Sequence, residues 1–243
     1  MSKNKTQKEF RIATLVPTRG LIFTKTITAI MRENALCGQY PAIFSTTDLP
    51  LPHSRNALVE DALASPHNFT HLLLVDDDII IPENGLKAML ELDADIAFID
   101  YPMHYAVGKW KNMSTACRDN WLPGEEWRDK PIVWAGLGCT LVKREVFEKL
   151  DKPWFVSGVK SFIRDSKTGK VNLMDATYPG EPGGGEDAYF FIHAGKKKLH
   201  IAEVKGMKAS HLRVEKFVLI MQTGKYKTQH KIKENSKIDQ PYK

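Results

Sequence analysis

The sequence predicts an α/β fold with a mostly parallel central sheet flanked by helices, and two observations support this prediction. Short, continuously apolar runs, which are typical of strands covered on both faces, recur through the first 100 residues. Between these runs lie segments whose apolar side chains recur at helical spacing. Such alternation of strand and helix favours parallel strands joined by crossover helices.

The first half of the chain contains the clearest elements. Pro17 and Gly20 end the first apolar run, so we expect a buried strand that is followed by a loop. Gly38 is a stop signal for the first helix. Ser54 is expected to cap the second helix, because a serine oxygen can accept an N–H group of the first turn. We expect strands at residues 12–16, 40–45, 71–75 and 94–99, and helices at residues 23–36, 55–63 and 82–92.

The second half is less regular. Long connections are expected at residues 101–128 and 157–185. The remaining expected elements are a strand at 132–141 interrupted by glycines, helices at 145–150 and 186–194, and a strand at 198–204. The predicted organisation is a polar leader at 1–11, one domain at 12–212 with a loop-rich second half, and a basic C-terminal helix and tail at 213–243.

The composition is typical of a soluble globular protein, because 42% of the 243 residues are hydrophobic and 26% are charged. No apolar run approaches the roughly 20 residues needed to span a bilayer. The polar N-terminus is not followed by the apolar segment of a secretory signal. The three cysteines lack the spacing of a zinc site or a disulfide framework, so they are expected to be reduced. We therefore expect a cytoplasmic protein without a transmembrane segment.

The net charge of +6 is concentrated near the C-terminus. Residues 205–243 contain ten Lys or Arg against three Asp or Glu, a net charge of +7, which leaves the first 204 residues at −1. The basic segment is expected either to be a solvated surface or to bind a polyanion such as nucleic acid or an acidic membrane.

Three consecutive aspartates, Asp76, Asp77 and Asp78, directly follow the apolar run 71–75. Ligands of α/β proteins bind outside the carboxyl ends of the strands. Adjacent carboxylates cannot all ionise without compensation, and a divalent cation supplies it. The alternative is a solvated acidic turn.

Further motifs follow one order along the chain: Arg55-Asn56, Gly136 and Gly138, Glu186-Asp187, and His211. With the aspartates, this order resembles the GT-A glycosyltransferases over residues 12–212. In that family a DxD motif at a strand end binds a metal ion and a nucleotide-sugar. The resemblance implies a GT-A, Rossmann-like fold whose loop-rich half binds the acceptor. It also implies transfer of a sugar from a nucleotide-sugar, with a UDP-sugar as the first expectation, to a hydroxyl group.

The resemblance implies a metal site for Mn²⁺ or Mg²⁺. Asp76 and Asp78 match the outer members of DxD, so Asp76 is expected to face the ribose or the metal and Asp78 to ligate the metal. His211 matches the histidine that completes the metal shell in many members. Asp77 is the intervening residue, and its acidity leaves the register open by one position.

The resemblance also implies the residues that bind the nucleotide-sugar. The first loop meets the nucleotide, an Arg-Asn pair lies beneath the donor, and the glycines form the base of the donor pocket: Pro17, Thr18, Arg19, Arg55, Asn56, Gly136 and Gly138. For Arg55, the alternative is an ion pair with Glu60 or Asp61 on the helix surface.

Asp187 matches the general base of inverting members, and Glu186 is its neighbour. If configuration is retained, Asp187 is expected to orient the acceptor or the sugar instead. The alternative is that both are ordinary carboxylates at the start of a helix, where the helix dipole favours them.

The acceptor is less defined. A compact enzyme with a basic C-terminal segment is compatible with the phage enzymes that glycosylate hydroxymethylated pyrimidines in DNA, and equally with saccharide or protein acceptors. Two other functions remain open: a nucleotidyltransferase of related fold, and a non-catalytic module that binds nucleic acid or another polyanion.

Overall fold

The central element of the fold is a six-stranded sheet. The computed structural model describes residues 9–18, 20–46, 49–102, 115–118, 132–157, 160–164, 171–175, 185–214 and 232–235. Within them the strand order of the sheet is β11-β5-β8-β3-β1-β2. The bounds are β1 (Ile12–Pro17), β2 (Ala42–Thr46), β3 (His71–Val75), β5 (Ile96–Phe98), β8 (Cys139–Lys143) and β11 (Ile201–Glu203).

Five of these strands run in one direction. β1 pairs in parallel with both β2 and β3, and β11 pairs in parallel with β5. β8 lies between β3 and β5 and is antiparallel to both. The predicted α/β fold with a mostly parallel sheet is therefore confirmed.

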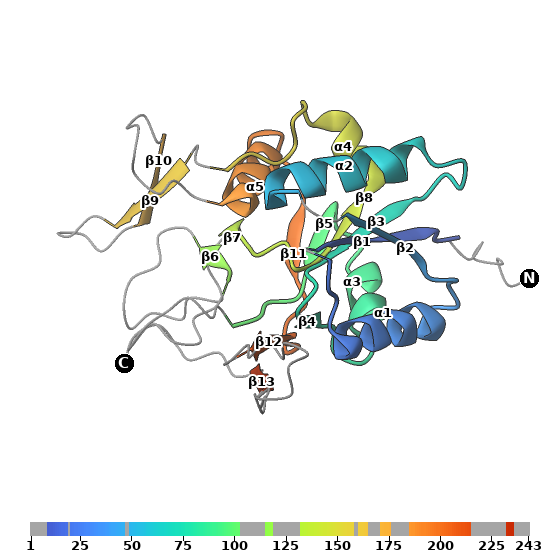
Figure 1. The fold of residues 1–243 in the computed structure, drawn as a ribbon. Coiled ribbons are helices and arrows are strands. Elements are labelled where there is room, and N and C mark those ends of the chain that lie inside the picture. Colours follow the sequence, from blue (N-terminus) through green and yellow to red (C-terminus); the bar gives the residue numbers. More distant parts are fainter. Residues whose placement is uncertain are drawn as a thin grey trace, which may run out of the picture.

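Helices cover both faces of the sheet (Figure 1). α2 (Leu51–Ala64), α4 (Arg144–Lys149) and α5 (Glu186–Lys196) lie on one face, and α1 (Thr24–Leu36) and α3 (Gly85–Glu91) lie on the other. Among the described residues, no helix combines the length and the apolar character that crossing a membrane requires.

The strand side chains divide between the two faces in alternation. In β3, Leu72 and Leu74 belong to the core under α2 and α5, whereas Leu73 and Val75 belong to the core under α1 and α3. All four are at most 1% exposed. Burial of both faces explains why the strand is continuously apolar in sequence.

Smaller strands surround the sheet. They are β4 (Ile79–Ile80), β12 (Ser210–Val214) and β13 (Ile232–Asn235) in one group, β6 (Cys117–Arg118) with β7 (Ile132–Trp134), and β9 (Lys160–Arg164) with β10 (Val171–Asp175). β12 is the middle strand of its group and is antiparallel to β4 and β13. β4, which follows the three aspartates, therefore lies in one small sheet with β12 and β13 from the C-terminal part of the chain.

Several predicted boundaries are wrong. The second helix begins at Leu51, and Ser54 lies inside it rather than capping it, because Leu51 and Pro52 occupy the first turn, where proline is tolerated. The strand expected at 132–141 is two strands, β7 and β8, separated by a turn at 135–138. The connection expected at 157–185 contains the β9–β10 hairpin. Most of the predicted basic helix and tail lies outside the described residues, and the described residues on either side of 215–231 form β12 and β13.

Candidate active site

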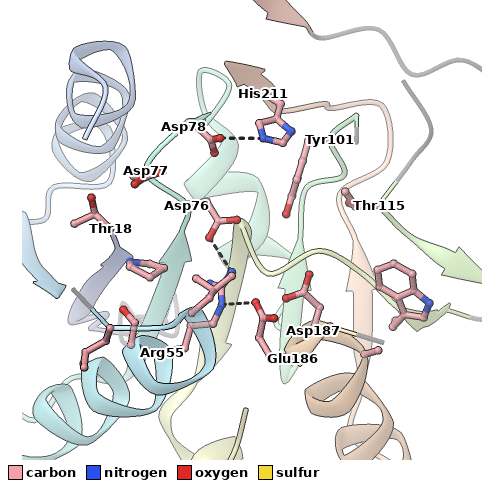
Figure 2. A pocket seen from close by; sticks show the side chains of 17 residues that line it. Thr18, Arg55, Asp76, Asp77, Asp78, Tyr101, Thr115, Glu186, Asp187 and His211 are labelled. Carbon is pink, nitrogen blue, oxygen red and sulfur yellow. Dashed lines mark hydrogen bonds and ion pairs between the residues drawn. The ribbon is translucent and has the colours of Figure 1, made fainter. Parts of the chain in front are cut away.

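One pocket lies outside the carboxyl edge of the central sheet (Figure 2). Its volume is about 660 Å³. In the order β2-β1-β3 the chain crosses from one side of β1 to the other, and ligands of α/β proteins bind at such switch points. The lining residues are Pro17, Thr18, Leu49, Leu51, Ser54, Arg55, Asp76, Asp77, Asp78, Tyr101, Thr115, Trp134, Gly185, Glu186, Asp187, Ala188 and His211. Nine of them were singled out in the sequence, so this pocket is the candidate active site.

The end of β1 forms one wall. The Thr18 hydroxyl donates a hydrogen bond to the Leu21 carbonyl at 2.7 Å and accepts one from the Gly20 N–H at 3.1 Å. Gly20 has a φ of +102°, a conformation that glycine adopts without strain. Thr18 therefore fixes the turn after Pro17, as expected for a loop that meets a ligand. Arg19, the third residue expected here, lies outside the described residues.

The three aspartates form a tight turn between β3 and β4. The Asp76 N–H donates to the Gly138 carbonyl at 3.1 Å, and the Asp76 carbonyl accepts from the Ile79 N–H at 3.1 Å. Figure 2 shows that Asp76 points toward Arg55, whereas Asp78 points toward His211. The turn therefore sends two carboxylates to different parts of the pocket.

The Asp78–His211 pair joins the turn to β12. His211 Nε2 lies 3.1 Å from Asp78 Oδ2, and His211 Nδ1 lies 2.9 Å from the Pro102 carbonyl. Because a carbonyl only accepts, Nδ1 carries a proton, which leaves Nε2 as the nitrogen that faces the pocket. Burial alone would lower the pKa of His211, but the hydrogen bond and the charge of Asp78 outweigh it, and the pKa is raised.

The Asp78–His211 pair has the chemistry of an incomplete metal site. Within the described residues, no three His, Cys, Asp or Glu side chains converge as a preformed cage. Magnesium is commonly held by one or two carboxylates while waters and substrate phosphates supply the other ligands. A carboxylate oxygen that faces an imidazole nitrogen, with a carbonyl behind the imidazole, fits a divalent ion completed by a bound diphosphate.

A second group of charges, which we call the Arg55 cluster, consists of Arg55, Asp76, Glu186 and Asp187. Arg55 Nη2 donates to Asp76 Oδ1 at 2.8 Å, and Nε donates to Glu186 Oε1 at 3.2 Å. Arg55 is 2% exposed, so the surface pair considered with Glu60 or Asp61 is wrong. Burial alone would lower the pKa of Arg55, but the carboxylates raise it, and the guanidinium stays charged.

Asp187 lies beside Glu186 in the first turn of α5. Burial is the main cause that raises the pKa of Asp187 well above its ordinary value, the charge of Glu186 adds to the shift, and Arg55 opposes it. Asp187 Oδ1 and Arg55 Nη1 are both buried and have no hydrogen-bond partner among the residues that the structure describes. Because buried polar atoms normally have partners, these two atoms indicate where a ligand can bind.

Tyr101 and Thr115 line the pocket and were not identified from the sequence. The Tyr101 hydroxyl accepts the Gly138 N–H at 3.0 Å, and its ring meets the His211 ring edge to face at 5.6 Å. Buried Asp100 accepts hydrogen bonds from the Tyr101 N–H and from the Thr115 N–H and hydroxyl. Asp100 and Tyr101 directly follow the strand expected at 94–99, as the three aspartates follow the strand at 71–75, so the same carboxyl-end argument could have found them.

Three residues predicted to bind the donor, Asn56, Gly136 and Gly138, are not among the residues that line the pocket. Asn56 binds backbone groups of Pro52, Trp154 and Phe155, and thereby anchors the segment after α4 to α2. Gly136 and Gly138 pack beneath Tyr101 instead of lining the pocket. A Cβ at Gly138 would lie 2.6 Å from Asp76 Oδ2, so the absence of a side chain lets Asp76 occupy its position.

Comparisons with known proteins show the fold. No protein-family model matches the sequence, and no curated protein matches it significantly. The chain is similar to A197 from STIV, with a TM-score of 0.52 and 19% identity over 83% of this chain and 85% of that chain.

Two further solved structures are similar at lower TM-scores. One is a Drosophila β-1,4-galactosyltransferase 7 variant in complex with manganese, UDP-Gal and xylobiose, with a TM-score of 0.43 and 15% identity over 82% of this chain and 67% of that chain. The other is a glycosyltransferase involved in the glycosylation of the major capsid of PBCV-1, with a TM-score of 0.34 and 14% identity over 59% of this chain and 69% of that chain. The likeness to A197, at 19% identity, concerns the architecture, which in this chain is a mixed α/β fold with a six-stranded, mostly parallel sheet.

Proposed function

We propose that the protein is a metal-dependent glycosyltransferase that moves a sugar from a nucleotide-sugar to a hydroxyl group. The observation that supports this proposal most is the arrangement of two groups in one pocket (Figure 2). The Asp78–His211 pair lies on one side, the Glu186 and Asp187 carboxylates lie on the other, and Asp76 lies between them.

The charge of the pocket supports the proposed role of a metal ion. Five lining residues are Asp or Glu, and Arg55 is the one Arg or Lys among the described lining residues. A nucleoside diphosphate is itself anionic, so the pocket would repel it unless a cation were added. Asp78 and His211 would hold Mn²⁺ or Mg²⁺, with Asp76 beside them, and the imidazole mildly favours manganese. When bound, the ion offsets the negative charge of the diphosphate leaving group.

The unpartnered atoms of the Arg55 cluster suit a sugar. Arg55 Nη1 is a donor and Asp187 Oδ1 is an acceptor, and a hydroxyl can satisfy one of each. We propose that a sugar hydroxyl does so, while Pro17 and Thr18 contact the nucleotide. UDP-sugars are the first donors to test.

Asp187 is proposed to act on the acceptor. A general base works best when its pKa lies near the working pH, and burial moves the pKa of Asp187 upward in that direction. In an inverting reaction Asp187 would accept the proton of the attacking hydroxyl, and Glu186 would hold Arg55. In a retaining reaction Asp187 would orient the sugar.

The acceptor is proposed to be a hydroxyl compound, and hydroxymethylated-pyrimidine DNA is one member of the panel. The basic residues of 205–243 would supply phosphate contacts. Each phosphate contact makes binding more sensitive to salt. If DNA is the acceptor, transfer to DNA should fall steeply as salt rises, whereas transfer to a simple saccharide should not.

The test is product analysis by chromatography. The protein is incubated with a panel of nucleotide-sugars and acceptors, with and without Mn²⁺. Release of a nucleoside diphosphate together with a glycosylated acceptor supports the proposal. Pyrophosphate formed from a nucleoside triphosphate and a sugar 1-phosphate would instead identify a nucleotidyltransferase. Binding of nucleic acid without turnover of any donor would favour the non-catalytic module.

A further inference from the structure

Arg55 joins three elements that are far apart in the sequence. It belongs to α2, and it binds Asp76 after β3 at 2.8 Å and Glu186 in the first turn of α5 at 3.2 Å. We propose that Arg55 is a positioning residue that fixes the base Asp187 relative to the metal-binding turn. This inference rests on the proposed function.

The need for such a residue follows from charge repulsion. Three carboxylates lie close enough to the Arg55 guanidinium to favour its charged form, and they belong to Asp76, Glu186 and Asp187. Without the cation, the three carboxylates would repel one another or take up protons. Since Asp76 and Glu186 come from different elements, repulsion would move the start of α5 away from the end of β3.

The geometry favours positioning over binding of the donor phosphates. The Nε and Nη2 edge of a guanidinium is one that binds a phosphate with two parallel hydrogen bonds. In this structure that edge binds two carboxylates, and Nη1 is the nitrogen that has no partner within the described part of the chain. One such nitrogen suits a single hydroxyl, so the main work of Arg55 is to hold its two neighbours.

The consequence is a specific kinetic signature. Displacement of the base from the reacting atoms by about 1 Å can lower turnover about 100-fold. Nucleotide binding depends on the first loop and the metal, so it should change much less. A residue that binds the donor phosphates would instead weaken nucleotide binding and change kcat less when it is replaced.

The experiment compares Arg55→Met and Arg55→Lys with a matched control, Arg144→Met. Arg144 also binds a carboxylate, Glu148 at 3.0 Å, and a carbonyl, that of Leu63 at 3.0 Å. Its Nη1 is also buried and has no partner among the described residues. Arg144 does not line the pocket. We expect Arg55→Met to lower kcat about 100-fold, with the Kd of the nucleoside diphosphate, which has no transferred sugar to contact Nη1, changed less than about threefold. Arg55→Lys should recover part of kcat, and Arg144→Met should retain the wild-type values.

A second measurement is independent of turnover. Hydrogen exchange of the first turn of α5 should be faster in Arg55→Met than in the wild type and in Arg144→Met. Thermal unfolding of Arg55→Met, Glu186→Gln and the double variant should be non-additive, because the two residues share one interaction. If Arg55→Met does not fold, Arg55→Lys and Glu186→Gln provide the same comparison.

The outcomes separate the two proposals. If Arg55→Lys or Arg55→Met weakens nucleotide binding as much as it lowers kcat/KM, and exchange in α5 is unchanged, Arg55 binds the donor and the inference is overturned. If the wild type turns over no donor, the proposed function fails. Hydrogen exchange and the double-variant cycle then still decide whether Arg55 fixes α5.

Discussion

The two ends of the candidate active site hold negative charge in different ways. In the Arg55 cluster a permanent cation, 2% exposed, lies between carboxylates of separate elements. In the Asp78–His211 pair the side chains are 31% and 14% exposed, and the imidazole carries a positive charge only when it is protonated. The permanent charge of Arg55 can hold neighbouring elements together at any working pH. The imidazole of His211 can instead lose its proton and bind a metal ion that arrives with the substrate. The comparison is consistent with the proposal that the Arg55 cluster holds the structure together and that the Asp78–His211 pair binds a metal ion.

The largest expected effect is at the Asp78–His211 pair. Asp78→Ala or His211→Ala should lower metal-dependent turnover about 1,000-fold or more, because a metal ion contributes several kcal/mol to stabilising charge in the transition state. Mn²⁺ binding, followed by the electron paramagnetic resonance of free Mn²⁺, should weaken in parallel. Asp77→Asn tests the register of the motif: an equal loss there would transfer the metal role to Asp77.

Asp187→Asn should lower turnover by about 10²- to 10⁴-fold, since it removes the proposed base. Mn²⁺ and nucleotide binding should stay near wild type, which separates the two ends of the pocket. Steady-state kinetics and calorimetric titration are the measurements. Turnover within a few-fold of wild type would show that the proton is taken by another group.

Arg55→Met should destabilise the fold by about 3–5 kcal/mol, because it leaves the buried Glu186 and the partly buried Asp76 without their counter-ion. Urea unfolding gives the free energy. The matched surface variant is Glu91→Gln, which breaks an ion pair with Lys87 whose side chains are 60% and 67% exposed. Its expected cost is below about 1 kcal/mol. Similar costs for both variants would refute a structural role for the Arg55 cluster.

Gly138→Ala tests the packing that places Asp76. The added methyl group would contact Asp76 Oδ2 and the Tyr101 hydroxyl, so we expect a loss of about 1–3 kcal/mol in the free energy of unfolding. Gly185→Ala is the control, because a Cβ there has no neighbour within 4 Å among the described residues. An unchanged melting temperature for Gly138→Ala would mean that Asp76 is not confined by this turn.

The smallest effect concerns pH. Burial raises the pKa of Asp187 above its ordinary value of 3.8, so the folded state favours the protonated carboxyl. Its contribution to stability is complete below pH 3.8 and is lost as the pH rises through the folded pKa. Asp187→Asn stays neutral and should raise Tm by about 2–4 °C above that folded pKa, with the difference shrinking as the pH falls and absent below pH 3.8. A Tm of Asp187→Asn below that of the wild type at neutral pH would contradict the raised pKa of Asp187.

The sequence was sufficient for the framework and for much of the site. Continuous apolar strands such as β3 and the aspartates at its end are local patterns, and they predicted the sheet and the place of the pocket. The start of α5 at Glu186 was also predicted, because acidic residues are common in a first helical turn.

Contacts between distant segments were not predictable in the same way. The direction of Arg55 depends on where α2 begins, and Pro52 in the first turn obscured that start. Asn56 stands next to Arg55, yet it binds the backbone of Trp154 and Phe155 instead of facing the pocket. The Tyr101 hydroxyl accepts the Gly138 N–H, and the Tyr101 ring packs against the His211 ring. No local sequence pattern links these three residues.

The most direct test of the central claim is the release of nucleoside diphosphate from a nucleotide-sugar, measured against Mn²⁺ concentration for the wild type and Asp78→Ala. The account predicts saturable, Mn²⁺-dependent release by the wild type that is lost on addition of a chelator. It also predicts a loss of about 1,000-fold in Asp78→Ala. Release that is independent of metal and equal in Asp78→Ala would contradict the assignment of this pocket.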